Sequence, residues 1–133
     1  MTIDISWQQP RRVIYERFYG TITIEEMTAI QQEFIRYLND GDAPVHAIID
    51  LGGVRDFPKS LTQIRQGLVT TGTTQLGRVV LVTGKNPLVK FISSVISQLI
   101  LKNAQYALCD SLDEAVRILR DRDPSVTLEQ IAD

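Results

Sequence analysis

Apolar and polar residues alternate near the start of the chain. Residues 3–7 place three apolar side chains on one face, which predicts a strand. Residues 12–19 form a second β-rich run, and a turn at residues 8–10 separates the two. The two runs are therefore expected to pair as a hairpin.

A helical period follows. Thr23 and Glu26 have the spacing of a capping box, and the helix they open is expected to run to about Leu38. Its inward face repeats every three or four residues: Met27, Ile30, Phe34 and Leu38. Ser60 and Ser111 open two further boxes, and Asn86 followed by Pro87 predicts another helix start.

Two long apolar runs lie between these helices, at residues 45–51 and 78–83. Such runs are typical of strands buried on both faces. Gly52 and Gly53 are expected to end the first run, and residues 106–109 form a short last strand. The order β-β-α-β-α-β-α-β-α predicts an α/β fold: a five-stranded, mixed, mostly parallel sheet with an antiparallel N-terminal edge strand and four helices.

Composition agrees with one globular domain over residues 1–133, ending in a short tail at residues 124–133. The chain has 133 residues, of which 44% are hydrophobic and 23% charged. Its 14 basic and 16 acidic residues give a net charge of −2, and no concentrated basic face stands out. We therefore predict no nucleic-acid partner.

Targeting signals are absent from the pattern. The N-terminus lacks an apolar signal core, and the most apolar stretch, residues 87–101, is too short and too polar for a membrane span. Cys109 is the sole cysteine, which fits a reducing compartment. The expected location is the cytoplasm, with no membrane span.

No catalytic constellation can be assembled from spacing. His46 is the only histidine and stands in a predicted buried strand, where a histidine satisfied by hydrogen bonds is the favoured interpretation. Cys109 has apolar neighbours, which favours a packing role over a reactive thiol. We predict no enzyme activity, no metal site and no cofactor, and keep a small enzyme of unknown reaction as an alternative.

A ligand or anion site is one interpretation of the carboxyl end of the sheet. Asp50, with Gly52 and Gly53, follows a central strand, where open α/β sheets bind ligands. Lys85 and Asn86 stand at a helix N-terminus, which favours anions. In the alternative interpretation, Asp50 accepts loop amides and shapes the turn.

Ser60 is a candidate N-cap and a candidate phosphoacceptor, and the two roles are compatible. A phosphate there would meet free helix amides and would add negative charge to the surface.

The helix predicted at residues 88–101 is apolar over about half of its circumference, more than a sheet-packing helix needs. The surplus has three interpretations: packing on a neighbouring helix, a partner in a dimer, or an acyl chain. The candidate interface residues are Phe91, Val95, Ile96, Leu99 and Ile100.

Three segments resemble the STAS domains, which have the anti-sigma-factor-antagonist fold, and are similar to their small SpoIIAA-like (STAS/SEC14-type) relatives. Residues 18–23 resemble the strand that ends in Gly before the first helix, residues 47–54 the central strand and turn, and residues 106–116 the closing strand and helix. Phosphorylated antagonists carry Asp-Ser-Ser-Gly after the central strand. Here residues 58–61 read Pro-Lys-Ser-Leu, so only Ser60 matches.

The resemblance implies a non-catalytic binding or regulatory module that acts through contacts with a protein partner or with itself, as a homodimer. The alternative is a SEC14-like carrier of a small apolar or acyl ligand.

Overall fold

A computed structural model describes residues 2–57, 75–91 and 105–126. Their elements follow the predicted order: β1 (Ile3–Gln9), β2 (Val13–Thr21), α1 (Ile24–Asp40), β3 (Val45–Asp56), β4 (Leu76–Val82), β5 (Gln105–Cys109) and α4 (Leu112–Arg122). A further helix begins at Pro87 and is described as far as Phe91. The helix expected from Ser60 lies outside the described residues.

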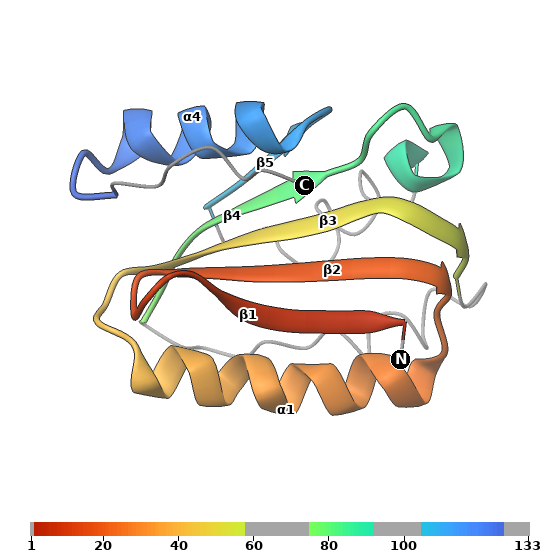
Figure 1. Ribbon diagram of the computed structural model, residues 1–133, viewed down its shortest axis with the longest axis horizontal. Coiled ribbons are helices and arrows are strands. Elements are labelled where there is room, and N and C mark those ends of the chain that lie inside the picture. The colour runs from red at the N-terminus through yellow and green to blue at the C-terminus, as the bar shows by residue number, and fades with distance from the viewer. Residues whose placement is uncertain (1, 58–74, 92–104, 127–133) are drawn as a thin grey trace.

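The strands form one five-stranded sheet in the order β1-β2-β3-β4-β5 (Figure 1). β1 pairs antiparallel with β2, and every other neighbouring pair is parallel. The predicted mixed α/β sheet with an antiparallel N-terminal edge strand is confirmed.

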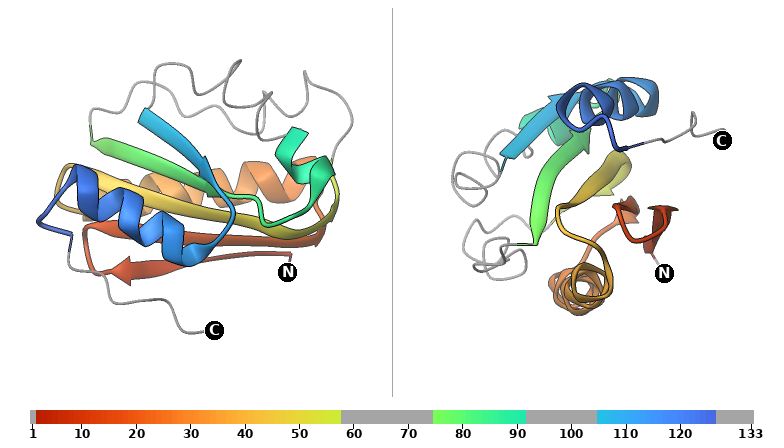
Figure 2. Two further views of the ribbon diagram at one scale, coloured as in Figure 1. Left: turned by 90° about the horizontal axis from the view of Figure 1, so that it is seen from above. Right: turned by 90° about the vertical axis from the view of Figure 1, so that its left-hand side faces the viewer.

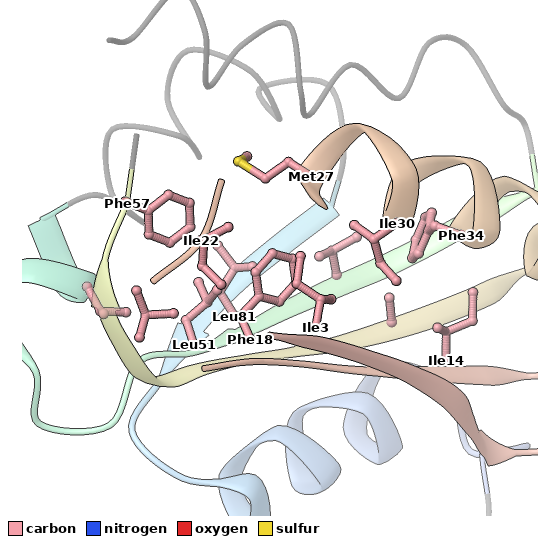
Figure 3. Packing of buried hydrophobic residues seen from close by; sticks show 14 of the residues in the cluster. Ile3, Ile14, Phe18, Ile22, Met27, Ile30, Phe34, Leu51, Phe57 and Leu81 are labelled. Atoms are coloured by element: carbon pink, nitrogen blue, oxygen red, sulfur yellow. The ribbon is translucent and has the colours of Figure 1, made fainter. Parts of the chain in front are cut away.

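The two complete helices lie on opposite faces of the sheet, α1 on one and α4 on the other (Figures 1 and 2). The α1-side core joins the predicted inner face of α1 to alternate residues of the strands, among them Ile14, Phe18 and Leu81 (Figure 3). The α4-side core joins Ala115, Val116 and Leu119 of α4 to the intervening strand residues, including Val13 and Ile48. The central strands are therefore buried on both faces, which explains their long apolar runs.

Capping fixes where the helices begin. Thr23 and Glu26 form the predicted capping box: Thr23 Oγ1 accepts from the Glu26 N–H at 3.2 Å, and Glu26 Oε1 accepts from the Thr23 N–H at 3.4 Å. Ser111 Oγ accepts from the Glu114 N–H at 3.2 Å and caps α4. Each bond satisfies an amide that has no partner within its helix.

The prediction that Gly52 and Gly53 end the third strand is wrong, because β3 continues through both glycines to Asp56. Arg17 of β2 pairs with Asp50, whereas Tyr19 pairs with Gly53, so β3 has one extra residue in this interval. That is the pattern of a β-bulge. A side chain at Gly53 would meet Tyr19 Cβ at 3.2 Å. Glycine thus permits close pairing here and does not terminate it.

Candidate functional site

The β-bulge in β3 shapes the carboxyl end of the sheet around Asp50. Asp50 Oδ1 accepts a hydrogen bond from the Gly52 N–H at 3.0 Å, and Asp50 Oδ2 accepts one from the Tyr15 hydroxyl at 3.2 Å. The carboxylate therefore holds the bulge and joins β3 to β2. This geometry agrees with the turn-shaping interpretation of Asp50, and a ligand role for it stays a prediction.

The backbone that follows β4 comes close to this bulge. Gly84 has a φ of 62°, and a Cβ placed on it would lie 3.6 Å from Gly52 Cα. Glycine suits position 84, because other residues rarely adopt a positive φ. The structure thus brings Asp50, Gly52 and the residues just before Lys85 to one edge of the sheet.

Asn86 is engaged at both ends of its amide group. Its Oδ1 accepts from the N–H groups of Leu88 and Val89, at 3.1 and 3.4 Å, and its Nδ2 donates to the Val54 carbonyl at 3.0 Å. The predicted cap is confirmed, and the side chain also fastens the new helix to β3. An anion at this helix start would compete with the Asn86 oxygen for two amides. Lys85 beside it is exposed.

His46 is satisfied at both ring nitrogens. The Arg78 N–H donates to Nδ1 at 2.9 Å, so Nε2 carries the proton and donates to Asp123 Oδ2, also at 2.9 Å. Arg12 donates to the same carboxylate oxygen at 2.9 Å, and Ser125 Oγ donates to Oδ1 at 2.6 Å. The bonds from Ser125 and His46 lower the pKa of Asp123 to about 2. His46 therefore has a structural role, as predicted.

Cys109 is a buried thiol near the end of β5. Burial raises its pKa to about 11, and its Sγ donates to the Ser111 carbonyl at 3.3 Å. A thiol with so high a pKa is almost entirely protonated at neutral pH and is a poor nucleophile. This agrees with the predicted packing role.

Large apolar side chains stand exposed where the helix from Pro87 meets the end of β5. Phe91 is 69% exposed, Leu88 45% and Leu108 43%. Lys90 Nζ lies 3.3 Å from Asp110 Oδ1, which brings the helix start to the end of β5. We call this group the Phe91 surface; it consists of Leu88, Lys90, Phe91, Leu108 and Asp110.

Several predicted site residues lie outside the described residues. They are Ser60, Val95, Ile96, Leu99 and Ile100. The phosphoacceptor role of Ser60 and the acyl-ligand role of the helix at residues 88–101 therefore stay predictions.

Sequence reasoning missed Glu16. This carboxyl is only 4% exposed and lies on β2 between Ile14 and Phe18, two buried members of the α1-side core. Burial raises its pKa to about 8. The signal for its burial is that it has a buried apolar residue two positions away on each side, in a strand that is covered on both faces.

Neither a protein-family model nor a curated protein matches the chain. Among solved structures, the chain is similar to an uncharacterised protein of the DUF3478 family from Shewanella loihica PV-4, which has a SpoIIAA-like fold. The TM-score is 0.63 at 14% sequence identity, over 88% of this chain and 91% of the other. This chain has a SpoIIAA-like fold.

The SpoIIAA-like fold confirms the resemblance predicted from residues 18–23, 47–54 and 106–116. Within residues 2–57, 75–91 and 105–126, none of the helices combines the length and apolar composition that a membrane crossing requires. In the same part of the chain, no three His, Cys, Asp or Glu side chains are grouped so that they could hold a metal ion.

Proposed function

We propose that this SpoIIAA-like chain is a non-catalytic binding module that acts through protein–protein contacts, and that its partner at the Phe91 surface is a second copy of itself. The observation that carries the proposal is the exposure of Phe91, which is 69%. Removing a phenylalanine side chain from water is worth about 2 kcal/mol. Leu88 and Leu108 extend the apolar area that a partner would cover.

Self-association is favoured by the charges on this surface. It carries one cation, Lys90, and one anion, Asp110, and both side chains are at least half exposed. In a two-fold symmetric contact the same patch meets itself, so Lys90 of each copy can face Asp110 of the other. The patch is therefore complementary to itself in charge as well as in apolar character.

The position of β5 supports the same partner. Among the described strands, β5 is the last in the order of the sheet. The outer edge of such a strand presents N–H and C=O groups for pairing. A second β5 lying antiparallel to the first would extend the sheet across the two-fold axis. Leu108 lies on this strand, so edge pairing and burial of the Phe91 surface are compatible.

The two described side chains that were considered as catalytic candidates are already engaged. Both ring nitrogens of His46 make hydrogen bonds, and the Cys109 thiol is buried with its pKa raised to about 11. These contacts favour binding over catalysis by His46 or Cys109.

Light scattering coupled to size-exclusion chromatography tests the proposal. The wild type is expected to be a dimer, and Phe91→Glu is expected to be a monomer. Losing about 2 kcal/mol on each of two copies weakens the dissociation constant roughly a thousandfold. The matched control is Ile35→Glu on the outer side of α1, because Ile35 is also an exposed apolar residue, at 42%.

The control should remain a dimer, and circular dichroism should show that both variants are folded. A wild type that stays monomeric at every concentration would refute the proposal. So would a Phe91→Glu variant that dimerises as strongly as the wild type.

A further inference from the structure

Glu16 occupies an unusual position for a carboxyl group. It lies near the middle of β2, paired with Ile5 of β1 on one side and with Ile49 of β3 on the other. Residues two apart on a strand share a face, so its side chain lies on the same face as Ile14 and Phe18. Both contribute to the core against which α1 packs (Figure 3).

The described residues around this carboxyl are apolar. On this face β1 presents Ile3, Ile5 and Trp7, and β3 presents Ala47, Ile49 and Leu51. From α1 come Met27, Ile30, Phe34 and Leu38. Tyr37 of α1 also packs against this core, and its ring centroid lies 5.0 Å from that of Trp7 with the two rings tilted by 49°.

No described residue donates a hydrogen bond to Glu16 or pairs with its charge. Burial is the cause that raises its pKa, from 4.5 to about 8. A buried carboxylate without a partner is costly, so the group holds its proton in the packed state. Once exposed to water, the same group would titrate near 4.5.

We propose that docking of α1 on the sheet is linked to protonation of Glu16, so that α1 is released more easily as the pH rises. Among the described elements, α1 is the complete helix on this face, and Val89 of the helix from Pro87 also packs there, while α4 covers the opposite face. Separation of α1 from the sheet would bring water to Glu16 without disturbing the α4-side core. This inference does not depend on the proposed dimer.

The proton balance fixes the direction of the effect. Between pH 4.5 and about 8, the docked form holds a proton on Glu16 and the open form does not. The equilibrium constant for opening therefore rises about tenfold per pH unit in this window and levels off above it. Across the whole window the increase is on the order of a thousandfold.

Amide hydrogen exchange of the whole chain, read residue by residue by NMR, tests the proposal. After correction for intrinsic exchange, the protection of Ile30 and Phe34 in α1 is expected to fall across this window. The amides of Ala115 and Leu119 in α4 report on the other face and should keep their protection. Equal loss in both helices, or no loss in α1, would overturn the proposal.

Glu16→Gln keeps the size of the side chain and removes its ionisation. Its α1 protection is expected to be independent of pH, and a variant with the wild-type pH profile would contradict the assignment to Glu16. If this variant does not fold, a carbon-13 NMR titration of the Glu16 carboxyl in the wild type decides the question. A midpoint near 8 supports the proposal, and a midpoint near 4.5 overturns it.

Discussion

Asp123 joins three parts of the described chain that are far apart in the sequence. Its carboxylate accepts from Arg12 just before β2, from His46 in β3 and from Ser125 beyond α4. Two of these donors lie at the amino ends of β2 and β3, and the third follows the carboxyl end of α4. The network therefore fixes α4 to the sheet by charge-assisted hydrogen bonds in addition to apolar packing.

Replacement of Asp123 by Asn should destabilise the protein at pH 7. The amide has no charge to pair with Arg12. Both oxygens of Asp123 accept hydrogen bonds, and the NH2 group that replaces one of them in asparagine cannot accept. We expect a loss of about 2 kcal/mol in the free energy of unfolding, measured by urea denaturation. Asp121→Asn, at an exposed position of α4, should change the free energy of unfolding by less than about 0.5 kcal/mol.

The same network predicts that the free energy of unfolding decreases at acid pH. The folded state lowers the pKa of Asp123 from 3.8 to about 2, so its contribution is present above pH 3.8 and is lost as the pH falls toward 2. Asp123→Asn should lack this part of the acid dependence. Equal stability of the two Asn variants at pH 7 would contradict the structural role assigned to Asp123.

At the scale of elements, the N-terminus of α1 carries an unusually complete set of bonds. Besides the capping box, the Thr2 N–H donates to Glu26 Oε2 at 3.2 Å, and the Thr2 hydroxyl donates to the same oxygen. These bonds lower the pKa of Glu26 and connect the helix start to the chain preceding β1. The box thus positions the helix as well as starting it.

Thr23→Ala should cost about 1 kcal/mol of stability, because the Glu26 amide loses its acceptor. Thr28→Ala is the matched control on the same helix. The Thr28 hydroxyl donates only to the Ile24 carbonyl, at 3.0 Å on the exposed side, and alanine is the better helix former. Thermal unfolding should therefore show a lower midpoint for Thr23→Ala alone. Similar midpoints for the two variants would argue against the box.

Local patterns were enough to predict most elements but not how two strands meet. The capping signals and apolar periods place α1 and α4 correctly because they depend on residues three or four positions apart. Gly52 and Gly53 were misinterpreted because glycines mark both strand ends and bulges. The choice depends on Tyr19 in the neighbouring strand, which no local pattern contains.

Sites formed by residues that are far apart in the sequence could not be predicted from local patterns either. The bond from His46 to Asp123 spans 77 positions in the sequence, and its existence depends on how α4 lies across the sheet. The burial of Glu16 likewise depends on the elements that cover the α1-side face of β2. Phe91, in contrast, belongs to a helix whose sequence has more apolar residues than packing on a sheet needs, so its exposure agrees with the sequence pattern.

At the scale of the whole molecule, each face of the sheet has its own core, and the Phe91 surface belongs to neither. Leu88 and Phe91 point away from the packed layers, while Val89 between them is buried in the α1-side core. The described part of this helix thus packs against the sheet with one side chain and exposes two others to water. That division is what a contact surface on a stable scaffold requires.

Hydroxyl-radical footprinting of the wild type over a dilution series tests this account most directly, with Phe91 and Ile35 compared in the same sample. If Phe91 mediates self-association, its oxidation rate should be low at high concentration and should rise on dilution, while that of Ile35 stays constant. Equal reactivity of Phe91 at all concentrations, at the level of a fully exposed phenylalanine, would contradict the proposed contact.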